Sequence, residues 1–247
     1  MDRKITLAIP YYNNSQFIKE AFEQVLNDER INEIIICDDK SPDVVEMEKI
    51  IHSMQCSKIK IYKNENNLGC YHNKINTVSK CTNEWCILLD SDNIISTHFI
   101  DTLYEIPLWN KTIIYAPSIA ETFPGEPSCY LNYQRFANQT ITNEMYISEA
   151  LTSANFQCLI NNCNYFLPVK EYVECAQLEE YERHIIDSLD SNVIFTDWMC
   201  KKNTIFVVDN LIYKHRIHSQ SNYELSIGKQ YIEIVRHQLL DKIKQIM

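Results

Sequence analysis

Residues 86–96 read CILLDSDNIIS, in which four apolar residues lead directly into two aspartates separated by one serine. The apolar run is typical of a strand that is buried on both faces. Asp and Ser are common turn residues, so a simple turn after the strand is one explanation of Asp90, Ser91 and Asp92. A pair of carboxylates that holds a divalent metal ion with a phosphate is the other. The surrounding segments decide between the two.

Strands and helices alternate regularly before this stretch. The expected strands are 4–10, 32–39, 58–64 and 85–90, and the expected helices between them are 14–27, 43–54 and about 70–80. The strands are apolar and rich in β-branched residues, whereas the helix at 14–27 repeats apolar residues every three or four positions. This alternation predicts an α/β fold with a mainly parallel, Rossmann-like central sheet flanked by helices.

Polar clusters follow all four expected strands. They read YYNN, DDKSPD, NENNLG and DSDN in chain order. The carboxyl ends of parallel strands meet at one edge of a sheet, where such folds bind their ligands. A turn explains each cluster singly but explains the set poorly, so we expect one shared crevice.

The second half of the chain is less regular. The expected elements are a strand at 112–117, a partly ordered segment at 118–150 with a helix near 143–151, a strand at 162–169, two or three helices within 171–203, a hairpin or two short strands at 204–218, and a long amphipathic C-terminal helix. No internal repeat and no flexible linker interrupts the pattern. Residues 1–247 are therefore expected to form one domain with two functional halves, about 1–117 and about 118–247.

Composition limits the classes of partner and compartment. Hydrophobic residues make up 45% of the 247 positions, and the net charge of −10 argues against a broad nucleic-acid-binding face. The ten cysteines show no CxxC spacing, and no signal peptide or transmembrane segment is recognisable. We therefore expect free thiols and a cytoplasmic protein.

Two common nucleotide-binding patterns are absent. The first strand is followed by PYYNNS, which has no glycine and so does not fit GxGxxG, and GxxxxGK[ST] does not occur. Phosphates must therefore be held by something other than a glycine-rich loop. A divalent cation that bridges carboxylates to a diphosphate can do this.

Four segments carry a resemblance to a known family. ITLAIPYYNN (5–14), IIICDDKSPD (34–43), ENNLG (65–69) and ILLDSDN (87–93), in this order and spacing, resemble the N-terminal half of family-2 glycosyltransferases with the GT-A fold. FTDWMCKK (195–202) and YKHRIHSQS (213–221) resemble that family more loosely. The resemblance implies transfer of a sugar from a nucleoside-diphosphate sugar, with UDP as the expected carrier, to a hydroxyl of a glycan or related acceptor. It assigns the donor to the first half and the acceptor to the second half with its terminal helix.

The resemblance also implies donor-binding residues. They are Pro10, Tyr11, Tyr12, Asp39, Asn67, Gly69, Lys74, Asp90 and Ser91. Asp39 is implied to accept the base N–H, and Lys74 stands about where an arginine is usual in the family. Each has a structural alternative: a core position for Tyr11, a loop or helix-capping acid for Asp39, and a solvated helix face for Lys74.

Asp90, Ser91 and Asp92 match the family's DXD motif, which implies that Asp92 ligates the metal. His218 is implied as a second ligand, and Mn²⁺ or Mg²⁺ is the expected ion because both prefer hard ligands and leave positions for phosphate. His215 falls on the opposite face of an extended segment, and Arg216 shares the face of His218 and could contact phosphate. A hydrogen-bonded structural histidine is the alternative for His218.

Inverting members of the fold need a base that deprotonates the acceptor hydroxyl. In the family it is an acidic residue near a helix start, and Asp197 is the expected match. Asp190 and either Glu179 or Glu180 are alternatives. Trp198 could stack on a sugar or pack in the core.

Two other functions stay open. A sugar nucleotidyltransferase shares the fold but usually opens with a glycine-rich loop, which is absent here. A catalytically degenerate sugar-nucleotide-binding subunit is argued against by the complete set of acids. An apolar stripe on the terminal helix is expected to pack on the core or to form a homodimer; it comprises Tyr231, Ile232, Ile234, Val235, Leu239, Leu240, Ile243 and Ile246.

Overall fold

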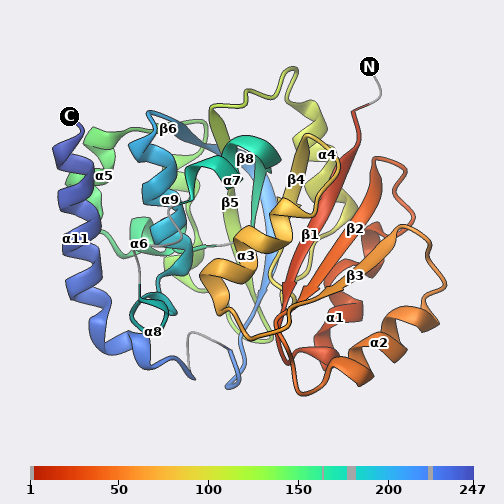
Figure 1. Ribbon diagram of the computed structural model, residues 1–247. Helices are drawn as coiled ribbons and strands as arrows, with labels where there is room; N and C mark the ends of the chain where they lie inside the picture. The colour runs from red at the N-terminus through yellow and green to blue at the C-terminus, as the bar shows by residue number, and fades with distance from the viewer. Residues whose placement is uncertain (1–2, 163, 177–181, 222–224) are drawn as a thin grey trace.

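The computed structural model in Figure 1 describes residues 3–162, 164–176, 182–221 and 225–247. Its described strands form one sheet in the order β3-β2-β1-β4-β7-β5-β8-β6. The strands are β1 (Ile5–Tyr11), β2 (Ile31–Asp38), β3 (Ile59–Lys63), β4 (Trp85–Leu88), β5 (Ile113–Phe123), β6 (Thr140–Ile141), β7 (Tyr165–Pro168) and β8 (Thr204–Arg216). A single sheet thus runs through both halves of the chain.

Helices cover this sheet, with α3 in front of it and α11 at the side of the molecule farthest from β3 (Figure 1). The α-helices are α1 (Ser15–Phe22), α2 (Val44–Ser53), α3 (Cys70–Ser79), α4 (Thr97–Glu105), α5 (Asn143–Glu149), α6 (Ala154–Ile160), α7 (Val169–Cys175), α8 (Arg183–Ile186), α9 (Asp190–Cys200) and α11 (Ile232–Gln245). The 3₁₀ turns are η1 (Glu23–Val25), η2 (Cys129–Leu131), η3 (Gln134–Phe136) and η4 (Ile227–Tyr231).

The N-terminal part of the sheet is parallel. β1 pairs in parallel with β2 and β4, and β2 pairs in parallel with β3. β1, β2 and β4 are almost entirely buried because helices lie against the sheet, which is why their sequences read as continuous apolar runs. The predicted mixed α/β fold with a mainly parallel N-terminal sheet is confirmed.

β7 runs against this direction. It lies between β4 and β5 and is antiparallel to both. Phe166 on β7 is fully buried, and its ring centroid lies 5.0 Å from that of Trp85 and 4.6 Å from that of Trp109. This aromatic cluster joins the two parts of the sheet through side-chain packing as well as through backbone hydrogen bonds.

The predicted hairpin or pair of short strands at 204–218 is wrong, because β8 is one strand of 13 residues. Asn210, in the middle of this strand, has a positive φ of 57°. Asn210 lies in a bulge. Val208 pairs with Pro117, and the next pair is Ile212 with Ile119, so the stretch of β8 between the two pairs is longer than that of β5.

Two other expectations about the elements also needed correction. β5 extends from Ile113 to Phe123, well into the segment expected to be partly ordered, and it pairs with β8 over most of its length. α4, which directly follows the stretch 86–96, was not expected from the sequence.

The terminal helix packs on the domain itself. Val235, Leu239, Leu240 and Ile243 are buried, and α11 lies against α5 and α9. Ile234 is 58% exposed, so the expected apolar stripe is narrower than its sequence suggested. Core packing is confirmed for these four residues, and a homodimer stays a prediction.

The cysteines and the helices give two further results. All nine cysteines in the described part of the chain are free thiols, as expected, and Cys163 lies outside the described residues. Within the same ranges, no helix has both the length and the apolar character that crossing a bilayer requires.

We predict that Phe166→Ala lowers the free energy of unfolding by about 3–5 kcal/mol, because it opens a cavity in the aromatic cluster. Urea denaturation measures this value. Leu108→Ala is the control: Leu108 is 82% exposed, so its truncation should change stability by less than about 0.5 kcal/mol. Equal effects of the two substitutions would contradict the role given to β7.

Candidate functional site

The site lies at the carboxyl end of β4, in the turn at 90–92, named here the DSD turn. Polar contacts from distant elements hold it in place. The Asp90 backbone N–H donates to Asn164 Oδ1 at 3.1 Å, and Asn14 Nδ2 donates to Ser91 Oγ at 2.9 Å. Ser91 is buried and its hydroxyl accepts within the protein, and its predicted role in donor binding stays untested. Asp90 and Asp92 are partly exposed on either side of it.

Asp92 meets His218 across 126 positions of sequence. His218 Nε2 lies 2.9 Å from Asp92 Oδ2, and its Nδ1 is buried with no partner among the described residues. The Phe17 ring lies against the imidazole, with centroids 4.9 Å apart. One carboxylate oxygen and one imidazole nitrogen thus stand together, which suits Mn²⁺ or Mg²⁺ when a ligand supplies the other oxygens.

A pair of backbone hydrogen bonds explains how His218 reaches this position. The Ile94 N–H donates to the Lys214 carbonyl at 3.0 Å, and the Lys214 N–H donates back to the Ile94 carbonyl at 2.9 Å. This bridge joins the segment after the DSD turn to the end of β8. His218 follows four residues later and therefore lies beside Asp92.

Arg216 and His215, from the same segment at 213–221, contact other residues of the protein. The Arg216 guanidinium is buried and donates to the Asp92 carbonyl at 2.9 Å and to Glu20 Oε2 at 2.5 Å. The structure therefore shows it supporting the DSD turn, and its predicted phosphate contact stays untested. His215 lies 3.4 Å from the Tyr213 hydroxyl, and burial lowers the pKa of its imidazole against the opposing pull of Asp92.

Lys74 lies between the DSD turn and α9. Its Nζ is 3.5 Å from Asp90 Oδ1 and 2.5 Å from Asp190 Oδ2, and it donates to Ser191 Oγ at 3.1 Å. The lysine is buried, so the alternative of a solvated helix face is wrong. Asp190 is the first residue of α9, which places an acid at a helix start within the site.

Asp39 organises the loop that follows β3. Its carboxylate accepts from the backbone N–H groups of Leu68 at 2.6 Å and Gly69 at 2.8 Å, and from Asn64 Nδ2 at 2.9 Å. A carboxylate offers about four acceptor positions, so one is left for a ligand N–H. Its structural role is thus shown, and contact with a nucleobase stays a prediction.

The same loop holds an arginine that sequence reasoning missed. Arg183 on α8 donates to the Asn67 carbonyl at 2.6 Å and also to Asn67 Oδ1, and the Asn67 side chain donates to the Asp39 carbonyl at 2.9 Å. The guanidinium lies over Gly69, the residue that directly precedes α3. The backbone of Gly69 has a φ of 83° and a ψ of 167°. No local pattern at 183 pointed to this contact, because it joins positions 116 residues apart.

The segment after β1 separates into buried and exposed residues. Tyr11 is fully buried and donates to Asp43 Oδ2 at 2.7 Å, and burial raises the pKa of its phenol. Its position fits the core alternative, and its predicted contact with a nucleotide stays untested. Pro10 is half-buried within β1, whereas Tyr12 is 50% exposed and can meet a ligand.

Asp197 is placed differently from its prediction. It is fully buried in the middle of α9 and accepts from the Tyr71 hydroxyl at 3.0 Å and from Lys242 Nζ at 2.9 Å. A base must reach a substrate hydroxyl, so this burial disfavours Asp197, whose predicted role as the base stays untested. Trp198 is also buried, with its indole N–H on the Thr204 carbonyl at 2.8 Å, and cannot stack on a sugar.

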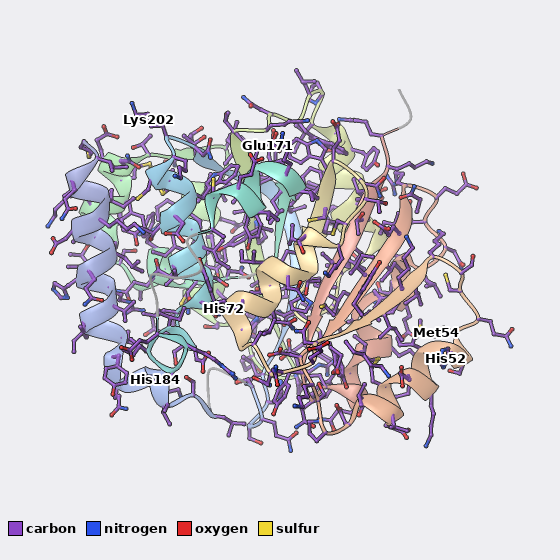
Figure 2. The ribbon with its side chains drawn as sticks, in the orientation of Figure 1. His52, Met54, His72, Glu171, His184 and Lys202 are labelled. Atoms are coloured by element: carbon purple, nitrogen blue, oxygen red, sulfur yellow. The ribbon has the colours of Figure 1, made fainter. Side chains whose placement is uncertain are left out.

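Among the alternatives for the base, only Asp190 lies in the site as described. Glu179 and Glu180 fall outside the described residues. Figure 2 shows His184 on α8, one residue beyond Arg183, near the lower end of the region between α3 and α11. This short helix leads the chain into α9 and so to Asp190.

Carboxylates outnumber cations at this crevice. The acids are Asp39, Asp90, Asp92, Asp187 and Asp190, and the cations in contact with them or near them within the described ranges are Lys74, Arg183 and Arg216, of which Arg216 is paired with Glu20. Burial raises the pKa of Asp187, the Arg183 charge opposes that rise, and the Asp190 charge adds to it. No three His, Cys, Asp or Glu side chains in the described part form a complete metal site. A metal here would need ligands from a bound molecule.

Comparisons with known proteins agree with this arrangement. The sequence profile described as "Glycosyl transferase family 2" matches residues 6–166. Glycosyltransferase GlyG of Streptococcus pneumoniae serotype 4 is 22% identical over 250 residues, which cover 98% of this chain and 81% of the relative.

Solved structures share the fold. The S. aureus TarS 1–349 complex with UDP is 15% identical with a TM-score of 0.61, over 98% of this chain and 70% of that chain. GalNAc-T7 with UDP, GalNAc and Mn²⁺ is 12% identical with a TM-score of 0.63, over 88% of this chain and 44% of that chain. At these identities the likeness shows the GT-A fold.

We predict that Gly69→Ala lowers the free energy of unfolding by about 1–3 kcal/mol, because its backbone conformation is nearly restricted to glycine. Urea denaturation measures the loss in the wild-type chain and in an Arg183→Ala background. A Cβ at Gly69 would lie 2.4 Å from Arg183 Nε, so the second background removes this contact. If the loss disappears there, the side-chain clash and not the backbone is its cause.

Proposed function

Because the chain belongs to glycosyltransferase family 2 and is a glycosyltransferase, we propose that it transfers a sugar from a UDP-sugar to a hydroxyl of a glycan or glycoconjugate, with a divalent metal ion and inversion at the anomeric carbon. One observation carries the proposal. Asp92 and His218 lie 2.9 Å apart beside the Lys74 contact with Asp90 and Asp190, at the carboxyl end of β4.

The charges of the site support a metal. A diphosphate that enters a crevice with five carboxylates and three cations, one of which is paired with the further carboxylate of Glu20, is repelled unless another cation accompanies it. Asp92 and His218 are the residues that would hold Mn²⁺ or Mg²⁺, and the diphosphate would supply further oxygens. The bound ion would neutralise the charge that develops on the leaving nucleoside diphosphate.

We assign the donor to about 1–117 and the acceptor to about 118–247. Tyr12 offers an exposed ring, and Asp39 retains one acceptor position for a base N–H such as that of uracil. TarS was solved with UDP and with UDP-GlcNAc, and GalNAc-T7 with UDP, which supports UDP as the carrier here. Pro10, Asn67 and Gly69 would form the rest of the nucleotide site, beside Asp90 and Lys74.

We assign the base to Asp190. In this step the carboxylate takes the proton of the acceptor hydroxyl, and the hydroxyl oxygen forms a bond to the anomeric carbon. The bond from that carbon to the diphosphate oxygen breaks on the opposite side, and the nucleoside diphosphate leaves with the electron pair. Lys74 orients Asp190 through its 2.5 Å contact and places it next to the DSD turn.

We predict that Asp190→Asn and Asp92→Asn separate turnover from binding. Asp190→Asn should lower release of UDP from a UDP-sugar by about 10²- to 10⁴-fold and leave the Kd for UDP with Mn²⁺ within about twofold. Asp92→Asn should weaken Mn²⁺-dependent UDP binding by about 10- to 100-fold. Calorimetry gives the Kd, and a coupled assay gives UDP release.

Asp241→Asn on the exposed face of α11 is the matched control and should change neither quantity. A thermal-shift comparison of UDP, GDP and dTDP with Mn²⁺ identifies the base. Binding of a UDP-sugar without any turnover would favour a sugar-nucleotide-binding subunit. Normal turnover by Asp190→Asn would overturn the base assignment.

A further inference from the structure

Polar contacts of Tyr71 and Lys74 join α3, which lies in front of the sheet, to α9, which lies on the side toward α11 (Figure 1). The Tyr71 hydroxyl donates to Asp197 Oδ2 at 3.0 Å, and Lys74 Nζ lies 2.5 Å from Asp190 Oδ2. Tyr71 and Lys74 are three residues apart on one face of α3. Asp190 and Asp197 are seven residues apart, about two turns, and so share one face of α9. The helices are thus joined at two levels about 10 Å apart along α9.

The contact between Tyr71 and Asp197 contains a negative charge that needs compensation. Asp197 is fully buried, and a buried carboxylate is stable only opposite a cation or several hydrogen-bond donors. Lys242 on α11 provides that cation, with its Nζ 2.9 Å from Asp197 Oδ1. Its side chain is 24% exposed, so the ammonium reaches the carboxylate from the rim of the helix interface.

We propose that Lys242 is a positioning residue for the transfer reaction. By neutralising Asp197, it keeps α9 against α3 and so holds Asp190 beside Lys74 and the DSD turn. The inference rests on the proposed function, because Asp190 is the base there. When the Lys242 charge is lost, α9 tilts so that water can reach the Asp197 carboxylate. Asp190 moves with it, because an α-helix behaves as a rigid element over two turns.

The apolar packing of α11 does not depend on this contact. Val235, Leu239, Leu240 and Ile243 bury the inner face of the helix without Lys242. Lys242→Met keeps the length and apolar stem of the side chain and removes only its charge. The substitution therefore tests the ion pair and not the presence of the helix.

The experiment compares Lys242→Met, Asp197→Asn and the double variant. Turnover is measured as UDP release with Mn²⁺ and whichever of UDP-glucose, UDP-galactose, UDP-GlcNAc and UDP-GalNAc gives the largest thermal shift. We expect Lys242→Met to lower kcat by about 10- to 100-fold, the effect of a displaced catalytic group, with the Kd for UDP and Mn²⁺ within about twofold. The double variant has no buried charge to neutralise and should recover to within about threefold of the wild-type kcat.

Two controls separate positioning from stability. Lys244→Met removes a half-exposed lysine of the same helix that faces Asp241, and Lys242→Arg keeps the charge; both should retain the wild-type kcat. A purely structural role would lower the amount of UDP-binding protein and the apparent kcat together. If Lys242→Met does not fold, the test uses the double variant of Lys242→Met and Asp197→Asn. This variant must then fold and release UDP with the kcat of the wild type.

Three results would overturn the proposal: an unchanged kcat in Lys242→Met, a loss that the double variant does not recover, or equal losses of UDP binding and kcat. Failure of the proposed function looks different, because it would show as normal turnover by Asp190→Asn. An inactive Asp190→Asn together with a fully active Lys242→Met would overturn this inference alone.

Discussion

The ammonium group of Lys74 lies between two carboxylates, 3.5 Å from Asp90 Oδ1 and 2.5 Å from Asp190 Oδ2. These residues come from α3, the DSD turn and α9, so one buried positive charge brings three separate elements together. Without it, two carboxylates would face each other in a region with little water, where like charges repel strongly. The two halves of the chain thus meet at the site through a lysine, in addition to the apolar packing around Phe166 that joins the two parts of the sheet.

Acidity dominates the rest of the crevice and limits what it can bind. Lys74, Arg183 and Arg216 are each already in contact with protein oxygens, so they compensate the five acids only in part. A site of this charge attracts a divalent cation and accepts a diphosphate together with it. The family membership and the charge balance therefore support the same chemistry from independent directions.

The sheet brings Asp92 and His218 together through a strand of unusual length. β8 continues past a bulge at Asn210 and reaches the segment after the DSD turn, where Ile94 and Lys214 exchange two backbone hydrogen bonds. A hairpin at this place would have turned the chain back before it reached Asp92. The bulge thus has a functional consequence, since it lets β8 follow β5 and still deliver His218 to the site.

Sequence by itself determined the strands of the N-terminal half, the order of the polar clusters at their ends and the identity of Asp90, Asp92 and His218 as candidates. These follow from local composition and from a family resemblance carried by contiguous segments. Only the tertiary structure decided that Tyr11 lies in the core while Tyr12 is exposed, that Arg183 lies over Gly69, and that Asp190 and not Asp197 lies in the crevice. Each of these depends on burial and on partners more than 20 residues away, such as Lys74 for Asp190 and Lys242 for Asp197, and no local pattern encodes which of two acids on one helix will face the crevice.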